Sequence, residues 1–526
     1  MAKNYDVIVA GGGHNGLVVA AYLARAGLSV LVVEAQDQCG GGAMSKRDLA
    51  APGFLTDMAS ISHGLIQPNP LLRNDELGLI SKYGLKYVFP ENTTACVFPD
   101  DRAVVFYRDV DKTCETIAQF SQHDAEAYRK FYETAIPQLD LLTAGMYIPT
   151  PPFGKFYSML EGSQEGRDLL HMILISTNDI ANEWFEDDHM KVAFNRFSAE
   201  TCMDPRVAGS GLNLFLMIPL LHKYGWPVLV GGSQSLPNAL IQSLTDNGGE
   251  VRTSARVTRF IVESGECKGV VLEGGEEIHA GRAVVTNFSI KQLDADMLGA
   301  ENLSEHYLKR VKNTQFQEFQ QFVQSYALHE APVYKAGKDV TDTWMVQLAP
   351  ETMDGFNAEF DAYSYGRPWT ETPVGLCATK WDTTRAPDGK HVLYLYHYEP
   401  YNLKGGAQRW DEIKEEVADG CLNSLRRHTT NMGPENIIGR WVNTPLDLER
   451  RDLAWKQGNS NHIGSQLIQQ YGNRPFAEVS DYRLPVEKLY LTGPSSHPGA
   501  SIMGGGRATA YVVMEDLGID FDDVVG

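Results

Sequence analysis

The sequence predicts an α/β protein with a Rossmann-type nucleotide-binding domain. Three stretches indicate this fold, at residues 5–34, 228–287 and 489–518, because each combines an apolar strand pattern with glycines and a helical segment. The first and last of these lie at opposite ends of the 526-residue chain. A single site built from all three therefore requires the two ends of the chain to meet.

The first stretch, YDVIVAGGGHNGLVVAAYLARAGLSVLVVEA, starts at Tyr5 and has the order strand, helix, strand. In that context a G-x-G-x-x-G spacing indicates dinucleotide binding. Gly11 permits the tight turn, Gly13 lets the backbone approach a pyrophosphate, and Gly16 permits close packing of helix on strand. The helix N-terminus attracts the phosphates. Glu34, which ends the second strand, is placed to accept hydrogen bonds from a ribose diol and disfavours the 2′-phosphate of NADP.

A second glycine pair, Gly40 and Gly41, follows Glu34 closely and extends the phosphate cradle along the cofactor. This combination is similar to that of the FAD-binding amine-oxidase and phytoene-desaturase superfamily, and it indicates FAD rather than NAD. An arginine often follows the pair in that superfamily, whereas Gly42 does here. The sequence therefore gives no direct arginine contact to the phosphates at this position.

The middle stretch begins with a glycine turn at Gly231 and Gly232 and continues as a helix, a strand and an antiparallel hairpin. In the same superfamily the backbone of the residue that matches Val257 contacts the adenine. Val257 is equally typical of any buried strand, so both interpretations stay open.

The last stretch, LYLTGPSSHPGASIMGGGRATAYVVMEDLG from Leu489, predicts a final parallel strand, a loop and a helix that begins near residues 503–506. Its glycines remove side chains where backbone amides would meet a flat ligand. A helix N-terminus aimed at the N1–C2 carbonyl edge of a flavin would stabilise the negative charge that develops on reduction. The predicted cofactor contacts here are Gly493, Ser501, Met503 and Gly504.

Composition limits the partners. The chain carries 46 basic and 67 acidic residues, for a net charge of −21, which argues against nucleic acid. Its seven cysteines are scattered without a C-x-x-C pair, so the sequence predicts neither a disulfide framework nor a metal site and favours a reducing compartment such as the cytoplasm. A strand from about residue 5 leaves no room for a signal peptide ahead of it.

One apolar stretch, residues 207–221, is too short to span a bilayer. We interpret it as a buried helix or pocket wall, with peripheral membrane contact as the alternative. The segment DFDDVVG at the end of the chain is expected to be a loose tail. Self-association as a homo-oligomer is left open.

Together with PGFLTDMAS from Pro52, TPLDLERRD from Thr444 and GNSNH from Gly458, these motifs resemble the phytoene-desaturase-like FAD-dependent oxidoreductases. Within that family they resemble the subgroup called pyridine nucleotide-disulfide oxidoreductase domain-containing protein 2. The resemblance implies a discontinuous FAD-binding domain of residues 1–70, 225–300 and 480–526. It also implies an α+β substrate domain of residues 70–225 and 300–480.

The family reaction implied is removal of a hydride from carbon to the flavin, by desaturation or alcohol oxidation of an apolar or aromatic small molecule. Oxygen or a quinone would then reoxidise the flavin. No second Rossmann fingerprint is present, so a separate NAD(P)H site is not expected. Two alternatives remain, a flavin-dependent isomerase without net redox and a non-catalytic FAD-binding interaction protein.

The candidates for proton handling are His462 in GNSNH and His497 in SSHPG, since an imidazole exchanges protons near neutral pH. For each, a structural histidine is the alternative. Asp57 and His63 are weaker candidates. The aromatic residues of HVLYLYHYEP, which are Tyr394, Tyr396 and Tyr398, are typical of a sheet wall, as core or as a substrate platform.

Overall fold

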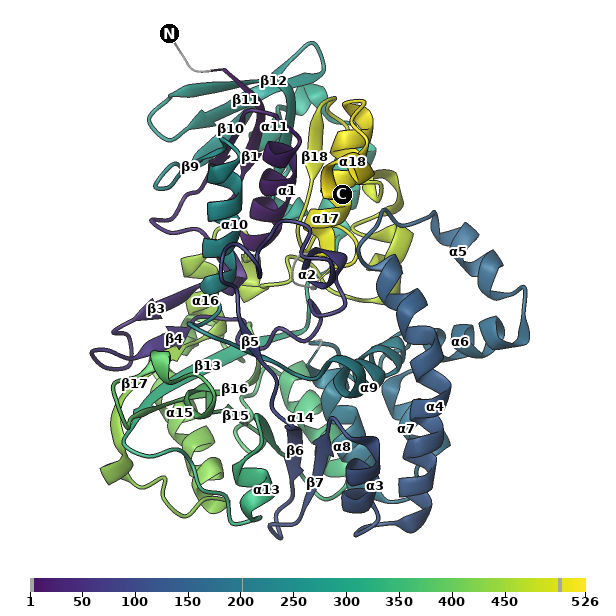
Figure 1. Cartoon of the computed structure of the whole chain (residues 1–526), viewed down its shortest axis with the longest axis vertical. Helices are drawn as coiled ribbons and strands as arrows, with labels where there is room; N and C mark the ends of the chain where they lie inside the picture. The colour runs from purple at the N-terminus through teal and green to yellow at the C-terminus, as the bar shows by residue number, and fades with distance from the viewer. Residues whose placement is uncertain (1–3, 201, 500–503) are drawn as a thin grey trace.

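In the computed structural model, which describes residues 4–200, 202–499 and 504–526, one sheet gathers strands from both ends and the middle of the chain (Figure 1). Its order is β10-β11-β12-β1-β2-β9, with β18 paired to β12. The pairs among β9, β2, β1, β12 and β18 are parallel, whereas β10, β11 and β12 form an antiparallel layer. The strands are β1 (Tyr5–Ala10), β2 (Val30–Val33), β9 (Glu250–Arg252), β10 (Val257–Glu263), β11 (Glu266–Leu272), β12 (Glu277–Thr286) and β18 (Leu489–Leu491).

Helices cover both faces of this first sheet. Val7 and Val9 of β1 pack in a core with α1 (His14–Arg25), α10 (Ser235–Asp246) and α17 (Gly504–Asp516). Ile8 and Ala10 point the other way, toward the core that includes α11 (Ala295–Leu298) and α12 (Glu305–Asn313). Burial on both faces explains why β1 is continuously apolar from Val7 to Ala10 instead of alternating. The predicted Rossmann-type α/β fold is confirmed.

A second sheet has the order β17-β13-β16-β15-β14-β6-β7 and is antiparallel except between β6 and β14. Helices from the first half of the chain, with α14, share a core with one face of it, and α15 packs on the other. This is the expected α+β arrangement. The strands are β6 (Asn92–Val97), β7 (Ala103–Tyr107), β13 (Phe319–Leu328), β14 (Met345–Leu348), β15 (Val374–Leu376), β16 (His391–Pro400) and β17 (Ile437–Asn443).

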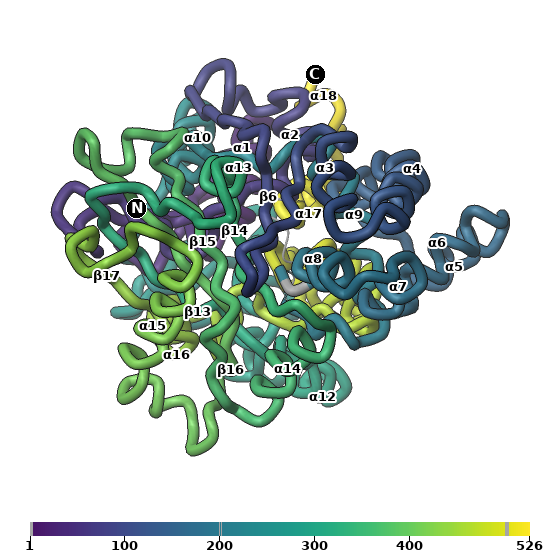
Figure 2. Tube along the Cα trace, turned by 90° about the horizontal axis from the view of Figure 1, so that it is seen from below, coloured from purple at the N-terminus to yellow at the C-terminus, as the bar shows by residue number. Residues whose placement is uncertain are grey.

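The remaining elements connect the two sheets or lie around them. The helices are α2 (Pro70–Arg73), α3 (Val110–Ile117), α4 (Gln122–Gly145), α5 (Phe153–Leu160), α6 (Gln164–Leu174), α7 (Thr177–Trp184), α8 (Asp188–Ala199), α9 (Leu212–Tyr224), α13 (Lys338–Thr341), α14 (Met353–Ser364), α15 (Trp410–Arg427), α16 (Pro445–Arg451) and α18 (Phe521–Val525). Short strands pair as β3 (Ser45–Arg47) with β4 (Leu55–Asp57) and as β5 (Tyr87–Val88) with β8 (Val228–Leu229). Figure 2 shows α5 and α6 projecting from the body of the molecule.

The apolar stretch at 207–221 forms a loop and most of α9. Leu214, Ile218 and Leu221 of this helix have no exposed surface, so its apolar side chains face the protein interior rather than a membrane surface. The interpretation as a buried helix is therefore confirmed. Within the described part of the chain, no helix is both long and apolar enough to cross a bilayer.

The expectation of a loose C-terminal tail is wrong. Asp520 caps α18 by accepting the backbone N–H of Asp522 at 2.9 Å. Phe521 is buried, with its ring centroid 5.2 Å from that of Tyr22 and 5.5 Å from that of Tyr511. One aromatic anchor and one cap thus fix a segment whose acidic composition suggested a solvated end.

Candidate cofactor and active site

The two glycine segments of the N-terminal motif lie against each other. Gly13 and Gly40 form an isolated parallel bridge, and the Gly40 N–H donates to the carbonyl oxygen of Gly12 at 2.9 Å. A Cβ on Gly41 would lie 3.1 Å from the Cα of Gly13. The glycines are therefore needed for two backbone segments to approach closely, and they leave bare backbone on the side that faces a cleft.

The N-terminal ends of α1 and α17 also meet, so the two ends of the chain contribute to one place. Asn15 Oδ1 accepts the backbone N–H of Gly506 at 3.0 Å. A Cβ on Gly506 would lie 2.7 Å from the carbonyl oxygen of Asn15, which only glycine avoids. Arg507 fixes the arrangement through two hydrogen bonds to Glu76, at 2.9 and 2.8 Å.

A cleft runs along the carboxyl ends of the parallel strands, where ligands bind in open α/β sheets. The predicted residues that line it are Gly11, Gly13, Glu34, Gly41, Val257 and His462. Gly42, which follows the glycine pair, lines it too. Gly16 and Gly40 pack behind the lining, and Gly493 adopts a positive φ beside Asn287. Gly504 is buried at the start of α17, while Ser501 and Met503 lie outside the described residues.

Glu34 organises the first turn of the cleft. Its Oε2 accepts the Gly12 N–H at 2.7 Å and its Oε1 accepts the Gln36 N–H at 2.9 Å, while burial raises the pKa of the carboxyl. Two cleft atoms, His14 Nδ1 and Asn287 Oδ1, are buried without a hydrogen-bond partner in the part of the chain that the structure describes. Buried polar groups are nearly always satisfied, so these atoms fit a polar ligand such as a dinucleotide.

The two histidines predicted for proton handling occupy different places. His462 lines the cleft, with Nδ1 3.3 Å from Ser495 Oγ, whereas His497 donates from Nε2 to the Gly145 carbonyl at 2.8 Å and does not line it. Burial lowers the pKa of His462 to about 3 and that of His497 to about 4. Both rings are thus neutral at neutral pH, and a catalytic role for either stays a prediction.

Buried histidines predict how stability depends on pH. Burial lowers their pKa values from the ordinary 6.5 to about 3 or 4, so the folded state binds fewer protons than the unfolded state within that window. The stabilisation is complete above pH 6.5 and is lost as the pH falls toward 4, by up to about 1.4 kcal/mol per pH unit for each group. The buried residues are His63, His222, His397, His462 and His497, and the half-buried His14 has the same direction of shift.

We therefore expect the melting temperature of the FAD-loaded protein to be flat above pH 6.5 and to fall steeply below it. Thermal unfolding followed by circular dichroism across pH 4 to 8 measures this, with flavin fluorescence reporting cofactor release. A melting temperature that stays constant from pH 6.5 to 5 would contradict the assignment of neutral buried rings.

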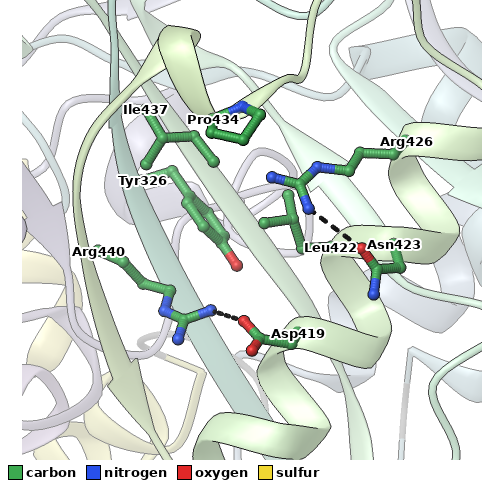
Figure 3. Close-up of a pocket in the computed structure, with 8 residues that line it drawn as sticks. All are labelled: Tyr326, Asp419, Leu422, Asn423, Arg426, Pro434, Ile437 and Arg440. Carbon is green, nitrogen blue, oxygen red and sulfur yellow. Dashed lines mark hydrogen bonds and ion pairs between the residues drawn. The ribbon is translucent and has the colours of Figure 1, made fainter.

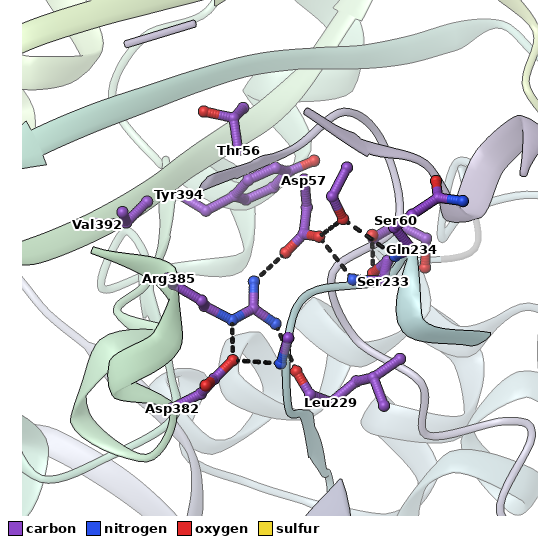
Figure 4. Close-up of polar contacts among 12 residues, drawn as sticks. Thr56, Asp57, Ser60, Leu229, Ser233, Gln234, Asp382, Arg385, Val392 and Tyr394 are labelled. Atoms are coloured by element: carbon purple, nitrogen blue, oxygen red, sulfur yellow. Dashed lines mark hydrogen bonds and ion pairs between the residues drawn. The ribbon is translucent and has the colours of Figure 1, made fainter. Parts of the chain in front are cut away.

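Asp57 lies in a buried polar network with Arg385, Asp382 and Ser233 (Figure 4), and His63 contacts this network through Ser233. Arg385 binds the Asp57 carboxylate through Nη1 and Asp382 through Nε, the latter at 2.9 Å, and all three side chains are 2 % exposed or less. Asp57 also accepts the Ser233 N–H at 2.8 Å. His63 Nε2 lies 3.1 Å from Ser233 Oγ. Asp57 and His63 therefore have structural contacts, which link the segment after the N-terminal glycines to the loop between β15 and β16 of the second sheet.

Sequence reasoning missed residues that the fold brings to the cleft. Asn287 follows β12 and would meet a Cβ placed on any of four predicted glycines, and its place at the carboxyl end of a parallel strand was an available signal. Arg451 lines the cleft from the end of α16, and its Nη2 has no hydrogen-bond partner among the described residues. Its guanidinium lies 4.8 Å from the Trp455 ring, and that ring lies 3.8 Å from a Cβ placed on Gly42. A distant arginine thus lines the same cleft as Gly42, which spacing along the sequence does not show.

Another hollow, of about 370 Å³, lies between α15 and β17 on the second sheet (Figure 3). Arg440 pairs there with Asp419 at 2.5 Å, and Arg426 donates to Asn423 Oδ1 at 3.1 Å. None of the predicted cofactor contacts lines it. The glycine-lined cleft is therefore the candidate site.

Comparison with known proteins agrees with this geometry. Residues 16–328, more than half of the chain, match the family of flavin containing amine oxidoreductases. The chain belongs to this family. Its cofactor is FAD, and the amine oxidoreductase fold accounts for the cleft described above. The buried atoms His14 Nδ1 and Asn287 Oδ1 and the glycine cradle are compatible with that cofactor.

Relatives within the family span nearly the whole chain. Pyridine nucleotide-disulfide oxidoreductase domain-containing protein 2 of Rattus norvegicus is 30 % identical over 98 % of this chain and 94 % of the relative. The lycopene-forming phytoene desaturase of Pantoea ananas is 25 % identical over 97 % and 99 %. Prolycopene isomerase 1 of an Oncidium hybrid is 24 % identical over 99 % and 85 %. The resemblance to the phytoene-desaturase-like FAD-dependent oxidoreductases is confirmed.

Among solved structures, an oxidoreductase from Methanosarcina mazei has a TM-score of 0.61 at 17 % identity and covers 97 % of this chain and 99 % of its own. At that identity the structural likeness supports the fold of the present chain and nothing beyond the fold. The cysteines of the present chain are free and buried in the described structure, so that structure holds no disulfide to match the one in the rat relative's name.

Proposed function

We propose that the chain is an FAD-dependent oxidoreductase that takes a hydride from a carbon centre of an apolar or aromatic small molecule, by desaturation or alcohol oxidation. Oxygen or a quinone would accept the electrons afterwards. One observation carries this proposal, which is that the buried aromatic wall formed by Tyr394, Tyr396 and Tyr398 of β16 is linked by hydrogen bonds to a loop that contacts the cofactor cleft. Tyr394 of β16 donates to the Ala59 carbonyl, and the neighbouring Ser60 N–H donates to the Gly42 carbonyl at 3.0 Å.

FAD, when bound, supplies the two-electron acceptor. The residues proposed to hold it divide the cleft by chemistry. The turn at Gly11–Gly16 and the α1 N-terminus would hold the pyrophosphate, Glu34 the ribose, and Val257 the adenine. Arg451 would add a desolvated cation, since burial lowers its pKa and Nη2 is unengaged in the described structure.

The helix α17 would face the flavin ring with its N-terminus. Its glycines leave the first turn without side chains, and positive potential at that end favours the reduced, more negative ring. His462, as a neutral buried imidazole in the cleft, is a candidate to accept a hydrogen bond or proton from the substrate. Tyr394, at the end of the aromatic wall nearest the cleft, and the Asp57 network would position the substrate and exclude water.

Isomerisation without net redox is the second candidate, and the match to a prolycopene isomerase over 99 % of this chain supports it. The two functions differ in the cofactor state that they need. A dehydrogenase starts from oxidised flavin and leaves it reduced, whereas an isomerase would return the flavin unchanged.

The test is the visible spectrum of the purified FAD-loaded protein under anaerobic conditions, with polyprenoid and aromatic alcohol substrates added one at a time. Bleaching of the oxidised flavin by a compound establishes the dehydrogenase and its substrate class. If no compound bleaches the flavin, but the chemically reduced protein rearranges a polyprenoid, the isomerase is correct. If neither occurs across the panel, the result favours the third alternative, a non-catalytic FAD-binding interaction protein.

A further inference from the structure

The aromatic wall of the second sheet carries a carboxyl group. Tyr394, Tyr396 and Tyr398 alternate along β16 and so share one face, with successive ring centroids 5.8 and 6.0 Å apart. Glu200, directly after α8, reaches this face. Its Oε2 accepts the Tyr396 hydroxyl and, at 3.2 Å, the Tyr398 hydroxyl, and its Oε1 accepts Gln347 Nε2 at 3.0 Å.

No ion pair with Glu200 is formed in the described residues. The nearby cation, Arg196, forms its ion pair with Glu359 at 3.1 Å and donates to the Thr372 carbonyl at 3.0 Å, and it acts on Glu200 only as a nearby charge that lowers the pKa. Burial is accordingly the largest influence on Glu200 and raises its pKa. A carboxyl group kept in such a wall carries a desolvation cost that its neighbours do not fully offset.

Two oxygen atoms beside Tyr396 and Tyr398 can accept further hydrogen bonds. Gln347 is fully buried, and its Oε1 has no partner in the described structure although its Nε2 is bound to Glu200. Each carboxylate oxygen accepts about two hydrogen bonds, so Glu200 Oε1, with one, has room for another. Glu200 itself is only partly buried, unlike Tyr396 at 5 % and Tyr398 at 2 % exposure. Two acceptors therefore lie side by side, and one of them belongs to a residue that keeps accessible surface.

We infer that Glu200 and Gln347 form a polar anchor for a hydroxyl group on an otherwise apolar substrate. This inference rests on the proposed function for its setting and names the substrate class, an unsaturated or aromatic alcohol rather than a plain hydrocarbon. The hydroxyl donates to one oxygen of the pair, and the apolar body lies along the tyrosines toward the cofactor cleft. The anchor lies two or more residues along β16 from Tyr394, so the hydroxyl it holds is distinct from the carbon that loses the hydride.

The test compares matched ligand pairs by isothermal titration calorimetry with the FAD-loaded, oxidised protein. The probes are farnesol with farnesene, geraniol with myrcene, and cinnamyl alcohol with β-methylstyrene. A hydrogen bond to a charged or buried acceptor predicts that at least one alcohol binds about tenfold or more tightly than its hydrocarbon. Glu200→Leu should abolish that preference while the hydrocarbon affinity changes little. Glu165→Gln, an exposed acid at the start of α6, is the matched control and should keep it.

Gln347→Leu is a second variant for the case in which Glu200→Leu does not fold, and it should weaken the same preference. A merely structural role would lower both affinities in a pair together. Equal affinities within every wild-type pair, or no binding by any probe, would overturn the anchor. This test can fail or succeed independently of the proposed function. If Glu200→Leu loses the preference for the alcohol and no compound bleaches the flavin, the anchor is supported and the oxidoreductase activity is contradicted.

Discussion

Replacing Arg385 by Met is expected to destabilise the protein by about 3–5 kcal/mol, because it leaves two buried carboxylates without their cation. Asp57 and Asp382 are each 2 % exposed or less, and Arg385 also donates to the Leu229 carbonyl at 2.8 Å. The guanidinium therefore ties β4, β8 and a segment between β15 and β16 to one another. Thermal unfolding of the FAD-loaded protein, followed by circular dichroism, measures the loss.

The control is Arg252→Met, which removes a bidentate pair with Glu276 at 2.7 and 2.6 Å on the surface. Exposed pairs are screened by solvent, so little change in melting temperature is expected there. Equal losses in the two variants would show that the buried network does not hold the cradle. A triple variant, Asp57→Asn, Asp382→Asn and Arg385→Met, should recover part of the loss, since it removes the unpaired charges as well.

Gly16→Ala is expected to weaken FAD binding by roughly 1–3 kcal/mol, or about 5- to 150-fold. A Cβ at this position would lie 2.3 Å from the carbonyl oxygen of Gly11 and 3.3 Å from Val9 Cγ1. The clash involves backbone, so α1 must move away from β1, and its N-terminal amides would leave the pyrophosphate. Titration of the apoprotein with FAD, followed by quenching of flavin fluorescence, gives the dissociation constant directly.

Gly154→Ala is the matched control for that substitution. Gly154 lies in α5, and no atom comes within 4 Å of an added Cβ, so this variant should bind FAD as the wild type does. If Gly16→Ala also binds FAD with unchanged affinity, the G-x-G-x-x-G turn is not the phosphate site. A variant that loses FAD yet keeps its circular dichroism spectrum separates the cofactor effect from misfolding.

Local pattern was sufficient for the nucleotide-binding elements. The strands β1 and β2, the helix α1 between them and the positions of Gly11, Gly13 and Glu34 follow from apolar runs and glycine spacing, which act over neighbouring residues. The same holds for the hairpin of β11 and β12 and for the strand–loop–helix that ends in α17. In the C-terminal tail the pattern misled, because α18 depends on the contact of Phe521 with Tyr22, a residue at the other end of the chain.

Only part of the candidate active site could be predicted from local sequence patterns. Of the two histidines proposed for proton handling, His462 lies in the cleft and His497 binds the end of α4, although both sit in similar polar loops of the sequence. Arg385 and Glu200 lie in no recognised motif, and Arg451 lies in TPLDLERRD without a spacing that marks it as a cleft residue. Their surroundings are assembled from segments that are 150 or more residues apart, as in the Arg385–Asp57 and Glu200–Tyr396 contacts.

Residue order alone was enough to establish the fold of the cofactor half, the family and the identity of the cofactor. Those properties depend on backbone turns and strand patterns, whose physics is contained within a few consecutive residues. Folding in three dimensions was needed to establish which charged groups are buried together and which polar atoms remain free to meet a ligand. Burial, desolvation and hydrogen-bond satisfaction depend on everything within a few ångströms in space, and that neighbourhood exists only once the chain has folded.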